Sequence, residues 1–197
     1  MPDTSIRKLG GTCAILVGIC YILFGVTTLL DPSQTSAAAW QTRIQSPTLF
    51  LIGQWSLVLG ALFALALVPA VAQWLEATNL GWVNWLSKIA YLGFFVTALA
   101  SVQAVSIDVL YASIDPSSWL VIGCVGLWVL GVNLLGLRVD TWPKPLAYLG
   151  LAVALMYGLA LVGNVLGIPI LFTIAAGLGG VVLAPIWYIW LGRLLRH

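Results

Sequence analysis

Charged side chains are scarce in this sequence. Only 7% of its 197 residues are Asp, Glu, Lys or Arg, whereas 61% are hydrophobic. A soluble domain carries about 25% charged residues, so the composition excludes a soluble protein and indicates an integral membrane protein. The net charge of +2 is too small, and the basic residues are too scattered, for a nucleic-acid partner. The lipid bilayer is therefore the first partner that we predict.

Side chains that perform catalysis or hold metals are equally scarce. The single histidine is His197, the last residue, which excludes haem ligation, histidine metal clusters and serine–histidine hydrolysis. Cys13, Cys20 and Cys124 lie in apolar runs and form no C-x-x-C pair, so they do not support thiol redox chemistry. A Walker loop, paired metal-binding carboxylates and a mid-span lysine for retinal are also missing. We predict that the protein is not an enzyme and has no metal and no cofactor, apart from a bound lipid or pigment.

Long apolar runs fill almost the whole chain. A helix needs about 20 apolar residues to cross a bilayer, and Asp31-Pro32 and Asp115-Pro116 each end such a run because proline cannot continue a helix. The run 146–191 is too long for one crossing at about 1.5 Å per residue, so we expect it to fold back at the turn-like segment 163–169. The predicted spans are 9–30, 47–72, 88–112, 119–137, 146–163 and 168–191.

These spans predict an all-α fold, a polytopic membrane helix bundle of six transmembrane helices in a single integral membrane domain, residues 1–197. A short additional helix is expected at 32–45. Asp31 suits its N-cap and proline suits its first turn, and Ala37, Trp40 and Ile44 lie on one face. A short helix with one apolar face is typical of a segment that lies in the membrane interface, here on the outer side.

The distribution of Lys and Arg predicts the orientation. With the N-terminus inside, the outer side carries Arg43 alone, and the cytoplasmic side carries Arg7, Lys8, Lys88, Arg138, Lys144, Arg193 and Arg196. Cytoplasmic segments are enriched in basic residues. We therefore expect both termini in the cytoplasm, with the bundle in a bacterial inner membrane or another internal membrane.

One span carries a polar stripe with a carboxylate. On a helix that turns about 100° per residue, an arc of about 80° holds Thr97, Ser101, Ala104, Asp108 and Tyr111. An ionisable residue inside a span is a functional-site hypothesis, so we expect this stripe to face protein or water and its helix to lie at the centre of the bundle. Arg43, the only outer basic residue, is the expected partner of the carboxylate. The candidate polar site is Asp108, Ser101, Thr97, Tyr111 and Arg43.

A second interpretation of Asp108 gives it no ligand. It lies roughly 30 Å of helix beyond Lys88, which is a full hydrocarbon thickness. At that depth its carboxylate would lie at the level of the outer headgroups and would only mark the end of the span.

Small residues at every fourth position predict close helix contacts in the last two spans. They are Gly150, Ala154 and Gly158 in one span and Ala176, Gly180 and Ala184 in the other. Small residues allow helix backbones to approach in a membrane, so we expect these two stripes to pack against each other.

Several short motifs resemble the bacterial six-span membrane family known as the domain of unknown function DUF4386. They are the Arg-Lys-Leu-Gly-Gly opening of the first span (7–11), the outer segment 36–46, Leu-Phe at 49–50, and Lys-Pro-Leu-Ala-Tyr-Leu-Gly at 144–150. The resemblance covers most of the chain and implies six spans. It implies no activity and no site residues.

Two functions are compatible with the sequence. The first is a non-catalytic membrane protein that binds a hydrophobic ligand, either a lipid or a pigment, or serves as an accessory subunit of a membrane complex. Abundant aromatic residues and the lack of catalytic groups favour it. The alternative is a small transporter or channel with a polar site near Asp108, favoured by the polar stripe and by prolines at 69, 169 and 185 as helix breaks.

Overall fold

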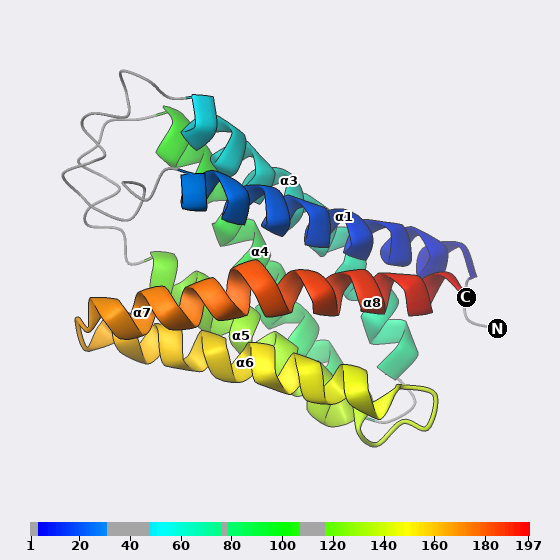
Figure 1. Ribbon diagram of the computed structural model, residues 1–197. Helices are drawn as coiled ribbons and strands as arrows, with labels where there is room; N and C mark the ends of the chain where they lie inside the picture. Colours follow the sequence, from blue (N-terminus) through cyan, green and yellow to red (C-terminus); the bar gives the residue numbers. More distant parts are fainter. Residues whose placement is uncertain (1–3, 31–47, 76–78, 107–116) are drawn as a thin grey trace.

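The computed structural model describes residues 4–30, 48–75, 79–106 and 117–197, and every regular element in these ranges is a helix (Figure 1). The first five are α1 (Thr4–Leu30), α3 (Thr48–Leu75), α4 (Leu80–Ser106), α5 (Ser117–Gly136) and α6 (Lys144–Val165). The last is a continuous rod built from α7 (Pro169–Ala176), the π-helix η2 (Gly177–Leu183) and α8 (Ala184–Arg196). We refer to α7, η2 and α8 together as the final rod.

Within the described ranges, five helical segments are long and apolar enough to cross a membrane. They are Ser5–Leu30, Thr48–Leu75, Leu80–Val105, Lys144–Val165 and Pro169–Arg196, and α5 contributes a shorter apolar helix, Val121–Gly136. The prediction of an all-α bundle of membrane-length helices is confirmed at this level. Six crossings stay a prediction, and the predicted interfacial helix at 32–45 lies outside the described residues.

The helix α4 begins before the predicted third span. That span was expected to begin at Lys88, but the helix begins at Leu80, two turns earlier. The side chain of Asn79 caps it, because its Oδ1 accepts a hydrogen bond from the backbone N–H of Trp82 at 3.2 Å. Trp82 and Trp85 are therefore exposed residues of the first turns of α4, rather than parts of a connection.

The helices form a closed ring in chain order. α1 packs against α3, α3 against α4, α4 against α5 and α5 against α6. The final rod packs against α6 on one side and, through η2 and α8, against α1 on the other, which closes the ring. In Figure 1, α8 accordingly lies between α1 and α6, and the start of α1 and the end of α8 lie at the same end of the bundle.

The prediction that the striped helix lies at the centre of the bundle is wrong. α4 is one wall of the ring and packs mainly between α3 and α5. Thr97 and Ser101 on its inner face are buried, whereas Leu92, Phe95 and Leu99 are about half exposed on its outer face. A narrow polar stripe needs only one protected face, and a wall helix supplies one.

The ring closes where α1 and α8 approach at two glycines. A Cβ atom on Gly192 would lie 2.5 Å from the carbonyl oxygen of Gly11 and 2.9 Å from the backbone nitrogen of Ile15. A Cβ atom on Gly11 would lie 2.7 Å from the carbonyl oxygen of Gly192. The two backbones are therefore in direct contact, as small residues permit in membrane bundles.

The predicted contact between two small-residue stripes is wrong. Gly150 does not face the final rod but makes room for the amide of Asn133 on α5, and Gly158 has no atom within 4 Å. The closest contact from a glycine of the final rod to α6 is made by Gly179, where a Cβ atom would lie 2.7 Å from the Cβ of Met156. Spacing alone indicated a stripe but not the partner that it would face.

The π-helical segment η2 has an identifiable local cause. The backbone N–H of Ala184 donates to the carbonyl of Gly179, five residues back, instead of four. The next residue is Pro185, which has no N–H and whose ring would clash with the carbonyl of Val181 in a regular α-helix. The wider π turn relieves that clash, and it changes which side chains of the final rod face the inside of the ring.

Candidate binding cavity inside the ring

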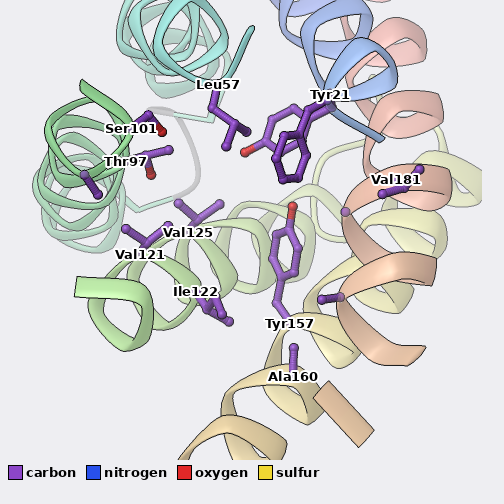
Figure 2. Close-up of a pocket in the computed structure, with 14 residues that line it drawn as sticks. Tyr21, Leu57, Thr97, Ser101, Val121, Ile122, Val125, Tyr157, Ala160 and Val181 are labelled. Atoms are coloured by element: carbon purple, nitrogen blue, oxygen red, sulfur yellow. The ribbon is translucent and has the colours of Figure 1, made fainter. Parts of the chain in front are cut away.

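The ring encloses a cavity of about 320 Å³ (Figure 2). Every wall contributes to its lining: Tyr21 and Phe24 from α1, Leu57 from α3, Thr97 and Ser101 from α4, Val121, Ile122 and Val125 from α5, Tyr157 from α6, and Ala176, Gly180 and Val181 from the final rod. The lining residues of α1 are in its second half and those of α5 are near its start. The cavity therefore lies in the half of the bundle that is remote from the chain termini.

Four side-chain hydroxyls interrupt an otherwise apolar lining. Figure 2 shows Thr97 and Ser101 on one side, Tyr21 on the other, and the hydroxyl of Tyr157 pointing into the space between them. Thr97 Oγ1 donates a hydrogen bond of 2.8 Å to the carbonyl of Gly93. The side chains of Tyr21 and Tyr157 are hydrogen-bonded to each other. The described lining contains no charged side chain.

Large aromatic side chains fill the ring on the side of the termini. Phe94 of α4 meets Trp128 of α5 edge to face with ring centroids 5.5 Å apart, and Trp128 meets Trp187 of α8 in the same way at 6.0 Å. Trp187 also packs against Tyr188 at 4.9 Å, and Tyr188 stacks on Tyr21 at 5.8 Å. We call Phe94, Trp128, Trp187 and Tyr188 the aromatic floor; all four are almost fully buried. The cavity is therefore closed at this end.

A buried amide holds the aromatic floor in place. Asn133 of α5 is fully buried, its Nδ2 donates to the carbonyl of Val129 at 2.7 Å, and its Oδ1 accepts from Trp187 Nε1 at 3.1 Å. Gly150 of α6 leaves the space that this amide occupies. One side chain thus ties α5 to α8 across α6, and it satisfies the buried indole N–H of Trp187.

The structure brings together two of the five predicted site residues. Thr97 and Ser101 line the cavity, while Asp108, Tyr111 and Arg43 lie outside the described residues. Sequence reasoning missed Tyr21 and Tyr157. A mid-span tyrosine needs a hydrogen-bond partner in lipid, so two such tyrosines were a signal that could have been used.

The described residues contain no group of three or more His, Cys, Asp or Glu side chains that could hold a metal ion. Comparisons with models of known protein families, with curated proteins and with solved structures find no match for this chain. The class of protein is thus defined by its architecture: a ring of membrane-length helices around an apolar cavity with one closed end. The resemblance to DUF4386 stays a prediction.

Proposed function

We propose that this protein is a non-catalytic integral membrane protein that binds one hydrophobic ligand, a lipid or a pigment, in the cavity of the ring. The observation that carries the proposal is the cavity itself, to which every wall of the ring contributes. Its volume of about 320 Å³ falls at the lower end of the range of small-molecule sites, about 300–1,000 Å³. Such a volume suits one small apolar molecule or part of one lipid chain.

The lining supports an apolar ligand with a small polar group. Leu57, Val125 and Val181 present hydrocarbon, and hydroxyls on opposite walls can fix an orientation. Binding sites for small molecules are typically apolar with a few placed polar groups. The closed aromatic floor favours binding over passage, because a channel needs a continuous path through the ring.

We expect a tryptophan in place of Gly180 to abolish ligand retention. Gly180 lines the cavity and has only the ring of Tyr157 near its Cβ position, at 4.0 Å, so an indole there would fill the space. Native mass spectrometry of the detergent-purified protein should show a retained lipid or pigment in the wild type and none in Gly180→Trp. The matched control is Gly158→Trp, because Gly158 is exposed and has nothing within 4 Å. Equal retention by both variants would contradict the proposal.

The proposed membrane topology has six crossings with both termini in the cytoplasm of a bacterial cell. α5 spans 20 residues, about 30 Å of helix, which is enough for the sixth crossing. Basic residues gather towards the end of the bundle that holds the termini, with Arg7 and Lys8 in the first turns of α1 and Arg193 and Arg196 in the last turn of α8.

Reporter fusions test this topology. Alkaline phosphatase fused after His197 should be inactive, because it would stay in the cytoplasm, and the same enzyme inserted near Arg43 should be active. A green fluorescent protein fused after His197 should be fluorescent and controls for expression. The reverse pattern of phosphatase activity would overturn the orientation.

One observation favours the alternative of a small transporter: the stripe residues Thr97 and Ser101 lie in the cavity opposite a π-helical wall. π-Helical turns are frequent at functional sites. A transporter would have to move its substrate past the aromatic floor, whereas a binding protein keeps its ligand.

The role of accessory subunit is tested in the same mass spectrum, by a second polypeptide retained after purification from the native membrane.

A further inference from the structure

We infer that the ligand is a neutral molecule whose polar group is a carbonyl oxygen, and that a buried tyrosine donates a hydrogen bond to this oxygen. The inference rests on the proposed function. The tyrosine cluster consists of Tyr21 of α1, Tyr157 of α6 and Tyr188 of α8. Its members come from three helices that meet only in the folded ring, at the boundary between the cavity and the aromatic floor.

The tyrosine cluster has more hydrogen-bond donors than its described surroundings use. Tyr21 and Tyr157 share one hydrogen bond, which uses the O–H of one of the two phenols. Because each phenol has a single O–H, the other O–H of the pair is still able to donate. The hydroxyl of Tyr188 also has no hydrogen-bond partner among the described residues, but it is buried and Tyr188 does not line the cavity, so the donor open to a ligand is the one that the pair leaves. A hydroxyl without a partner in a dry interior is costly, so the cluster favours a ligand that brings an acceptor.

The threonine on the opposite wall does not supply that donor. Thr97 already donates to the carbonyl of Gly93, so it offers the cavity only lone pairs. The phenols and the hydroxyl of Ser101 are thus the lining groups that can donate to an acceptor oxygen, and Figure 2 shows the hydroxyl of Tyr157 directed into the cavity. A carbonyl oxygen has two lone pairs and no hydrogen, which complements a cluster with unspent O–H groups.

The described part of the lining favours a neutral ligand over an ionised one. No Lys, Arg, Asp or Glu is among the described lining residues, and the walls are hydrocarbon and aromatic rings. An unpaired charge in such surroundings loses its hydration without gaining a counter-ion. The same low polarity strengthens a hydrogen bond from a phenol to a neutral carbonyl.

Three chain-matched probes test the inference on the full-length protein in lipid nanodiscs: 2-undecanone, undecane and undecanoate in its ionised form. We expect 2-undecanone to bind about tenfold more tightly than undecane, as one hydrogen bond to a buried donor predicts, and undecanoate not to bind. In the double variant Tyr21→Phe, Tyr157→Phe the preference for the ketone should disappear while undecane binds as before. Each single variant keeps one phenol and should keep part of the preference, and Tyr148→Phe is the matched control because Tyr148 is exposed on the same helix as Tyr157.

The carbonyl stretching frequency of the bound ketone gives a readout independent of affinity. It should be lower in the wild type and in Tyr148→Phe than in the double variant Tyr21→Phe, Tyr157→Phe, since a donated hydrogen bond weakens the C=O bond. Equal affinities for ketone and hydrocarbon in the wild type, both blocked by Gly180→Trp, would overturn the inference and leave the proposed function intact. Tighter binding of undecanoate would also overturn it. If no probe binds the wild type, or Gly180→Trp binds them all, the proposed function itself fails.

Discussion

A valine in place of Gly192 should prevent α1 and α8 from closing the ring. The Cβ atom would lie 2.5 Å from the carbonyl oxygen of Gly11 and 2.9 Å from the backbone nitrogen of Ile15. Both are backbone atoms of α1, which cannot rotate away as a flexible side chain can. Overpacking of a tight core costs about 3 kcal/mol when the surroundings do not yield, so we expect Gly192→Val to lower the midpoint of thermal unfolding by roughly 6–12 °C.

The measurement is a thermal-shift series in detergent, read by size-exclusion chromatography of the surviving folded protein. Gly158→Val is the control, because it makes the same change of helix propensity at a position with nothing within 4 Å. A midpoint for Gly192→Val equal to that of the control would show that the two backbones are not in contact. Gly11→Val should behave like Gly192→Val, since the same contact is met from the other side.

Local features of the sequence predicted the helices well where a chemical signal marked an end. The turn expected at 163–169 lies between the end of α6 at Val165 and the start of α7 at Pro169. Gly167 has a φ of +65°, the left-handed conformation that favours glycine, and Ile168 N–H donates to the carbonyl of Gly163 at 2.7 Å. Proline and glycine impose such a turn through their own backbone preferences, so no tertiary information is needed.

The rotation of each helix could not be predicted in the same way. The polar residues of α1, α3 and α6 gather on no single face, so no polar face shows which side turns to the lipid. In a bilayer, hydrocarbon on either side of a helix is equally well solvated, and rotation is decided by packing. This is why the stripe on α4 correctly indicated that Thr97 and Ser101 are protected, whereas the small-residue stripe of α6 indicated the wrong neighbour.

The cavity was beyond sequence reasoning for a related reason. It depends on which volumes the aromatic side chains leave empty, and Trp128 illustrates this: a mid-span tryptophan is compatible with either lining a pocket or filling a core. In the ring its contacts with Phe94 and Trp187 place it in the core, one turn along α5 from the cavity residue Val125. Only the arrangement of three helices distinguishes the two roles.

An alanine in place of Trp128 should open the aromatic floor. On α5, Val125 lines the cavity, Trp128 follows one turn later, and Val132 and Leu135 line a void of about 10 Å³ beyond it. Trp128 itself borders that void and is 1% exposed. Removal of its indole would therefore join the void to the cavity. We expect the free energy of unfolding to fall by about 3 kcal/mol. This is the lower end of the range for a buried aromatic residue changed to alanine, because the transfer of a side chain from lipid to protein adds little hydrophobic energy.

Added indole should restore part of the lost stability by refilling the space. The midpoint of thermal unfolding should rise with indole concentration, because a ligand that binds only the folded state stabilises it by mass action. The control is Trp82→Ala: Trp82 is 57% exposed on α4, so its loss should change the unfolding midpoint little and indole should not act on it. In the double variant Trp128→Ala, Gly180→Trp the filled cavity should slow or abolish the rescue, because indole reaches the floor through the cavity. A Trp128→Ala variant with wild-type stability and no response to indole would show that this side chain does not close the cavity, and a transport path through the ring would then become the better interpretation.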